Sequence, residues 1–95
     1  MNLSSCNLVD DDLNGIGALK NTLEVLHLES NGNLTNGALL HCKYLAKLKI
    51  LNLRRCRWIN DLSPLKDCLN LEEVDVSSCE GLTNNSLVRC GDLLK

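Results

Sequence analysis

Aromatic side chains are nearly absent from this sequence. It contains no phenylalanine, one tryptophan and one tyrosine among 95 residues, yet 44% of its residues are hydrophobic. Leucine and other aliphatic residues therefore have to form the core almost alone. A core of one side-chain type suggests a repeated structural unit, and a chain of this length is enough for one small domain.

An excess of positive charge is also lacking. Ten lysines and arginines stand against twelve aspartates and glutamates, which gives a net charge of -2 and a pI near 5.6. Proteins that bind nucleic acid neutralise its phosphates with clustered basic residues. We therefore expect that nucleic acid is not the primary partner.

Long hydrophobic runs are missing as well. No run approaches the roughly 18 apolar residues that a membrane-spanning helix needs, and the N-terminus lacks the charged, apolar and small-residue order of a secretory signal. We expect no membrane association, and an intracellular, cytoplasmic location.

Recognised catalytic motifs are absent too. The sequence contains no C-x-x-C pair for zinc, no phosphate-binding or dinucleotide-binding glycine loop and no G-x-S-x-G turn. His41 and Cys42 are adjacent, but Cys42 has sister residues without a histidine, so packing explains it better than thiol catalysis. The three acids at 10–12 suit the first turn of a helix. We predict a non-enzyme without metal or cofactor.

An internal repeat is the strongest positive feature. The segments Leu23–Leu28, Leu48–Leu53 and Leu71–Val76 share one pattern of aliphatic residues, and they begin 25 and 23 residues apart. Met1 and Leu3 fit the same pattern one repeat earlier. Each segment reads as a short strand, followed by a polar turn and a helical or irregular return. Ser63 and Pro64 are expected to cap one such return and to occupy its first helical position.

The six cysteines follow the repeat. Four equivalent positions after the strands hold Cys6, Asn31, Cys56 and Cys79, and a second series holds Cys42, Cys68 and Cys90. Six cysteines are compatible with three disulfides in a secreted protein. Repetition at interior positions favours buried free thiols instead, because a thiol there acts as a small apolar side chain. We predict that all six are reduced.

These segments and cysteines resemble the cysteine-containing subclass of the leucine-rich repeat family, whose unit reads L-x-x-L-x-L-x-x-C with a turn and a later cysteine. The resemblance covers the full chain and is best from Leu71 to Cys90; Asn31 departs from the subclass pattern but agrees with the wider family. It implies an α/β leucine-rich-repeat solenoid of about four units, with a parallel sheet on the concave side and short helices or irregular returns on the convex side. The single domain 1–95 would comprise units of approximately 1–22, 23–47, 48–70 and 71–92, truncated at both ends.

Strand alternation predicts which residues point outward. If Leu26 and Leu28 point inward, His27 between them points out, and Asn52 and Asp75 are its equivalents in the next strands. Solenoid sheets of this kind present binding surfaces. We predict that nine residues contact a partner: His27, Glu29, Lys49, Asn52, Arg54, Arg55, Trp58, Asp75 and Ser77.

Trp58 has two interpretations. It aligns with Asn33 and Gly81, which are small or polar, so it is expected at the rim of the sheet, where a tryptophan beside arginines has the composition of a binding hot spot. Alternatively, it lies over the space left by Gly81 and packs on its own turn.

The functional prediction is an interaction module that binds another protein. In the cysteine-containing subclass such arrays often act as substrate receptors of ubiquitin ligases, although no F-box-like segment is present here. The alternative is a structural spacer within a longer array whose recognition lies elsewhere. Terminal units without polar caps also predict end-to-end self-association.

Overall fold

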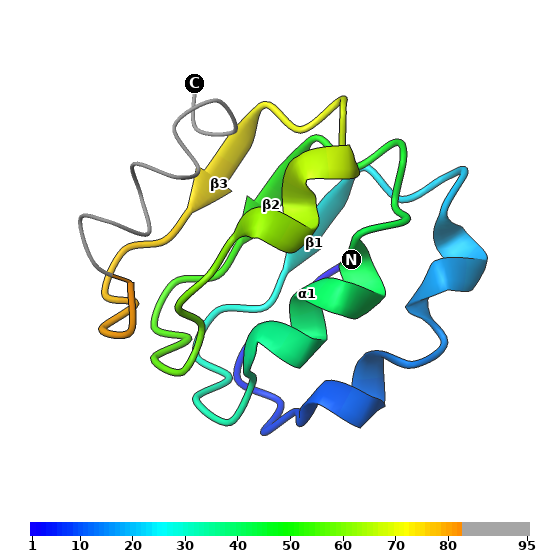
Figure 1. The fold of residues 1–95 in the computed structure, drawn as a ribbon. Helices are drawn as coiled ribbons and strands as arrows, with labels where there is room; N and C mark the ends of the chain where they lie inside the picture. The colour runs from blue at the N-terminus through cyan, green and yellow to red at the C-terminus, as the bar shows by residue number, and fades with distance from the viewer. Residues whose placement is uncertain (83–95) are drawn as a thin grey trace.

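The structure, a computed structural model, describes residues 1–82. Three short parallel strands form one sheet in the order β1-β2-β3, and the connections between them carry one α-helix and one of the three 3-10 helices (Figure 1). The elements are η1 (Asp10–Leu13), η2 (Ile16–Leu19), β1 (Val25–His27), α1 (Asn36–Cys42), β2 (Ile50–Asn52), η3 (Ser63–Asp67) and β3 (Glu73–Asp75).

Strand register follows the repeated leucine pattern. Leu26 pairs with Leu51 and Leu51 with Val74, so the inward side chains of the three strands form one row. The N-terminal segment lies beside β1 but makes only an isolated bridge there, between Asn2 and His27. Equivalent positions in the repeated segments therefore do stand side by side.

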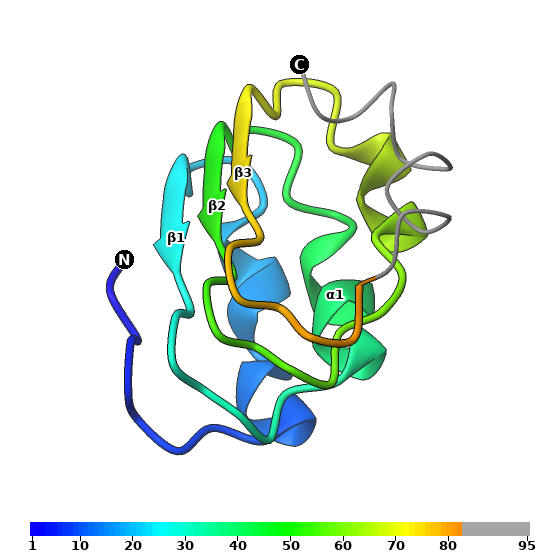
Figure 2. The same ribbon diagram turned by 90° about the vertical axis from the view of Figure 1, so that its left-hand side faces the viewer.

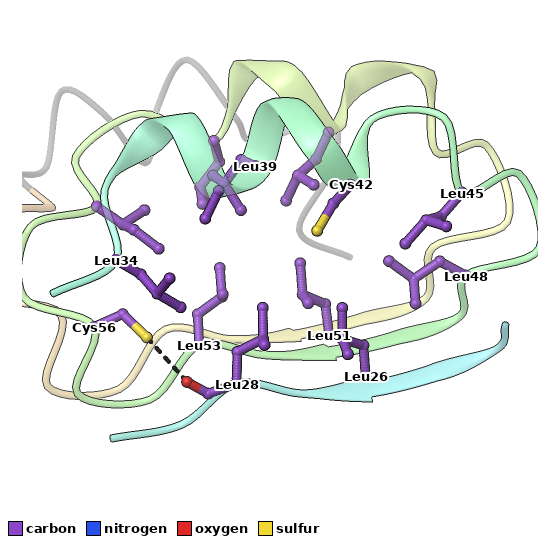
Figure 3. Packing of buried hydrophobic residues seen from close by; sticks show 14 of the residues in the cluster. Leu26, Leu28, Leu34, Leu39, Cys42, Leu45, Leu48, Leu51, Leu53 and Cys56 are labelled. Atoms are coloured by element: carbon purple, nitrogen blue, oxygen red, sulfur yellow. Dashed lines mark hydrogen bonds between the residues drawn. The ribbon is translucent and has the colours of Figure 1, made fainter. Parts of the chain in front are cut away.

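The helices of the described residues all lie on one side of the sheet (Figure 2). The inward leucines of β1 and β2 meet side chains from α1 across this layer (Figure 3). Fully buried leucines dominate the core: Leu26, Leu28, Leu34, Leu39, Leu45, Leu48, Leu51, Leu53 and Leu62. Each such leucine contributes about 1.5–3 kcal/mol through burial, so a core without phenylalanine is still adequate.

One left-handed residue follows each strand segment and turns the chain toward the helical layer. Ser5, Ser30, Arg55 and Ser78 have φ angles of 55°, 62°, 65° and 58°. No glycine occupies this position, although glycine would adopt the conformation most easily. The turn is therefore a regular feature of the fold and includes one bulky side chain, at Arg55.

A buried asparagine or cysteine closes the turn. Asn31 has no exposed surface, and its amide accepts hydrogen bonds from the backbone N–H of Cys6 and of Leu8, both at 3.1 Å, and donates to the carbonyl of Leu28 at 2.9 Å. The thiol of Cys56 donates to that same Leu28 carbonyl at 3.3 Å (Figure 3). Every buried polar side-chain atom in residues 1–82 has a hydrogen-bond partner.

Helix starts are held by side chains of neighbouring segments. The hydroxyl of Thr35 accepts from the backbone N–H of Gly37 and caps α1, while the Asp10 carboxylate accepts from the backbone N–H of Thr35 at 2.8 Å. The expected acids do lie in the first turn of η1. Ser63 does not cap η3: its own N–H donates to the Asp61 carboxylate at 2.9 Å, and Leu62 is the N-cap.

The predicted solenoid of about four units is wrong. The described residues form a small α/β structure with three strands, one α-helix and three 3-10 helices, and they contain no array of four equivalent units. The first expected unit forms no named strand: Met1 and Leu3 exchange backbone hydrogen bonds with His27, and the segment makes only an isolated bridge there. The return predicted after β3 lies outside the described residues.

Candidate protein-binding face

One side of the sheet has no helix of the described residues over it (Figure 2). We call this side the uncovered face and define it by the outward side chains of the strands: Val25, His27, Ile50, Asn52, Glu73 and Asp75. An open hollow of about 600 Å³ lies over its β2 and β3 part, between His27 and Ser77. The uncovered face can therefore receive side chains or an extended segment from outside.

Two polar residues of this face also accept hydrogen bonds from the backbone just after their own strands. The Asn52 side chain accepts a hydrogen bond from the backbone N–H of Arg54 at 3.0 Å, and the Asp75 carboxylate accepts one from the backbone N–H of Ser77 at 2.9 Å. The hydroxyl of Ser77 donates to the same carboxylate. This hydroxyl bond, more than any other cause, lowers the pKa of Asp75, so the carboxylate stays ionised.

Lys49 lies just before β2, at the opposite end of the strand from Arg54. Its ammonium group is 3.1 Å from the Glu24 carboxylate, and both side chains are exposed. The hydrogen bond to Glu24 raises the pKa of Lys49. Lys49 already has an anionic partner, which makes it less available to a ligand than the arginines.

An exposed basic segment follows β2. We name it the arginine–tryptophan ridge and define it as Arg54, Arg55, Arg57 and Trp58, all exposed. The guanidinium carbon of Arg57 lies 5.7 Å from the centre of the Trp58 ring, within cation–π range. The indole nonetheless remains 58% exposed.

Trp58 does not pack away over Gly81. Both residues line an open hollow of about 280 Å³, together with Arg57, Asn60 and Glu80. Gly81 instead lies against backbone, because a Cβ atom there would be 2.7 Å from the Arg57 carbonyl oxygen. Trp58 is therefore exposed, and its contact with a partner stays a prediction.

The structure brings most of the predicted residues together. His27, Asn52 and Asp75 form one row through the strand register. Just beyond the strands, the backbone N–H of Ser30 donates to the Arg54 carbonyl and that of Arg55 to the Ser77 carbonyl. Glu29, Arg54, Arg55 and Ser77 thus lie at the same end of the sheet, whereas Lys49 lies at the other.

Three outward residues were missed from the sequence: Val25, Ile50 and Glu73. Each lies two positions before a predicted outward residue, so strand alternation carried the signal. Val25 and Ile50 are apolar, and an aliphatic residue in a leucine-rich segment is normally predicted to lie in the core. They were therefore not predicted to point outward. Their half-buried side chains add apolar surface to the uncovered face.

The cysteines offer little chemistry. Cys42, Cys56, Cys68 and Cys79 are buried free thiols, whereas Cys6 is exposed, contrary to the expected interior position. Cys90 lies outside the described residues. Burial raises the pKa of Cys42 to about 12 and that of Cys56 to about 11, which disfavours the thiolate needed for attack. Residues 1–82 contain no cluster of side chains suited to a metal ion.

Comparison of the chain with protein-family models, curated proteins and solved structures found no match. In the described part of the chain, no helix has the length and apolar character required to cross a membrane.

Proposed function

We propose that this chain binds another protein through its uncovered face. The observation that carries the proposal is a parallel sheet on which the helices of residues 1–82 lie on one face only. Parallel sheets are almost always covered on both faces, because their crossover connections place helices there. A parallel sheet that leaves one face open has room for a partner on it.

The chemistry of the face supports a protein partner. Val25 and Ile50 pair with each other and supply half-buried apolar surface, and His27, Asn52 and Asp75 form a polar row two residues further along the strands. Protein interfaces commonly combine apolar and polar groups in this way. The exposed Trp58 and its arginines are of the residue types enriched in interface hot spots.

We also retain, as proposals, kinship with leucine-rich repeat proteins, a non-enzymatic role and an intracellular location. The repeated strand pattern and the cysteine and asparagine positions support the first of these. The raised pKa values of the buried cysteines support the second, because neutral thiols are poor nucleophiles. Free thiols at five described cysteines support the third, since oxidising compartments favour disulfides.

The test begins by isolating a partner with the whole chain as bait, identifying it by mass spectrometry and purifying it. Calorimetry then measures its affinity for the unaltered chain and for Asn52→Arg, which places a long cation at the centre of the face. We expect a loss of at least about tenfold, because the long arginine side chain would occupy space over the sheet and prevent close packing of a partner there.

The matched control is Lys66→Glu, an exposed change of charge on η3 in the helical layer. Its affinity should stay within about twofold, and circular dichroism should be unchanged for both variants. Equal affinity of Asn52→Arg and the unaltered chain would contradict the proposal and would favour a spacer role.

A further inference from the structure

We infer that the arginine–tryptophan ridge binds an acidic peptide segment, with carboxylates on Arg54 and Arg55 and an apolar side chain against Trp58. This inference rests on the proposed protein-binding function and specifies the chemistry of the partner. It concerns the end of β2, whereas the proposed function concerns the sheet face itself.

The arginines of the ridge carry charge without an acidic partner in residues 1–82. Three arginines fall within residues 54–57 of a chain whose net charge is -2. Within residues 1–82 the ion pair of Lys49 with Glu24 is the only one, so none of the three guanidinium groups is within 4 Å of a described carboxylate oxygen. Guanidinium groups bind carboxylates through two parallel hydrogen bonds, which makes arginine the natural receptor for an acidic segment.

A neighbouring acid, Asp75, is already engaged. Arg54 is close enough to Asp75 to contribute to the lowering of its pKa, yet the main causes are the hydrogen bonds from Ser77. Asp75 therefore directs its carboxylate to Ser77 and leaves the Arg54 guanidinium available. A carboxylate from a partner would meet Arg54 without displacing an existing ion pair.

Arg55 also has an unusual backbone conformation. Its φ of 65° is left-handed, and the equivalent turn positions hold Ser5, Ser30 and Ser78. A left-handed conformation costs a bulky residue roughly 1–2 kcal/mol, and residues held in such conformations cluster at functional sites. Because three serines adopt the same conformation, the strain belongs to the turn itself; a long cation in place of serine is the feature that the turn does not require.

Trp58 supplies the surface for an apolar contact. Arg57 covers part of the Trp58 ring, and its guanidinium also lies beside Gly32, where an added Cβ would be 3.7 Å from the Arg57 Nε. The exposed remainder of the indole opens on the hollow that it shares with Glu80 and Gly81. Because Arg57 and Glu80 line this hollow with opposite charges, it does not favour an acid, and Trp58 offers it an apolar surface; the carboxylates belong at Arg54 and Arg55.

The test uses the chain's single tryptophan as a reporter located in the site itself. Trp58 fluorescence of the full chain is titrated at low salt with a short peptide of glutamates around one leucine. The matched probes are the same peptide with every glutamate replaced by glutamine, and an oligothymidylate of equal length. We expect saturable binding of the glutamate peptide, at least about tenfold weaker binding of the glutamine peptide, and weakening by salt.

Two variants assign the effect to the ridge. Arg54→Gln with Arg55→Gln should weaken the glutamate peptide at least about tenfold, and Arg54→Gln with Arg55→Asn should do the same. The second variant places asparagine in a backbone conformation that it tolerates, so it guards against a loss of folding. The matched control, Lys20→Gln with Lys66→Gln, removes two exposed positive charges from the helical layer and should stay within about twofold.

Three results would overturn the inference: no saturable binding of the glutamate peptide, tighter binding of the oligothymidylate, or equal affinity of the ridge variants with unchanged circular dichroism. None of them contradicts the proposed function if Asn52→Arg still weakens the purified partner. Conversely, if the ridge binds the peptide and Asn52→Arg leaves the affinity for the partner unchanged, the inference about the ridge stands and binding through the uncovered face is contradicted.

Discussion

The two faces of the same three strands differ in almost every physical respect. On the covered face, Leu26, Leu51 and Leu53 have no exposed surface and pack under α1. On the uncovered face, His27 and Asn52 are half-buried and polar. Residues adjacent in sequence thus have opposite roles: the inward side chains stabilise the fold, and the outward side chains remain available to contact a partner. If this division is correct, adjacent substitutions should have very different consequences.

The largest expected effect comes from the covered face. Leu51→Ala should lower the free energy of unfolding by about 3–5 kcal/mol, because it removes a fully buried side chain from the middle strand and leaves a cavity. His27→Ala, which removes an outward side chain of β1, should lower the free energy of unfolding by less than about 1 kcal/mol. Urea denaturation followed by circular dichroism measures both. Similar losses for the two variants would remove the distinction between the faces.

Asn31 and Cys56 are buried at equivalent positions after β1 and β2, and their substitutions should lower stability by different amounts. Asn31→Ala should cost about 2–4 kcal/mol, because it leaves the N–H groups of Cys6 and Leu8 without their acceptor. Cys56→Ala removes one thiol donor and should cost only about 1 kcal/mol. Denaturation of both variants under reducing conditions tests the ranking, and a larger loss for Cys56→Ala would reverse our account of the turns.

Glycine substitutions give a smaller effect with a clear sign. Gly81→Ala should cost about 1–3 kcal/mol, since its Cβ would lie 2.7 Å and 3.0 Å from the carbonyl oxygens of Arg57 and Ile59. Gly15→Ala has open space around the new Cβ and an ordinary backbone conformation, so it should be neutral or should stabilise by up to about 1 kcal/mol. Thermal unfolding of the pair measures the difference. A neutral Gly81→Ala would show that the turn at 57–59 is not close to residue 81.

The smallest effect near neutral pH is the titration of the buried thiols. Burial raises the pKa of Cys42 from 9.0 to about 12 and that of Cys56 to about 11. The folded state therefore favours the neutral thiol, and its contribution is complete below pH 9. The unfolded chain ionises first, so the free energy of unfolding should fall as pH rises from about 9 toward 11 and 12.

Denaturation between pH 8 and pH 10 measures this decline. Replacing Cys42 and Cys56 by alanine should flatten it, relative to the unaltered chain, even though both replacements lower stability at every pH. An equally steep decline in the double variant would assign the effect to other groups.

Local periodicity predicted the inner face well. The spacing of Leu26 and Leu51 fixed both their burial and the register, and with it the row of His27 and Asn52. Exposure of Trp58 followed from its alignment with small or polar residues. These successes share a cause, since the alternation of side chains along a strand is a property of a few consecutive residues.

The failures required information from outside a single segment. Four copies of a pattern suggested four units of structure, but the first copy makes only one isolated bridge to β1. Cys6 fits the interior series in sequence and is nevertheless exposed. Arg55 adopts a left-handed backbone conformation, and the sequence has no glycine at this position to indicate it. Each depends on what packs against the segment in three dimensions.

Backbone amide NMR of the isotopically labelled chain, titrated with the purified partner, tests the central claim most directly. We predict that the largest chemical-shift changes fall on the uncovered face and the ridge, at His27, Asn52 and Arg54, while α1 and η3 change little. Largest changes on α1 and η3, with the signals of β1 and β2 unmoved, would contradict the assignment of binding to the uncovered face.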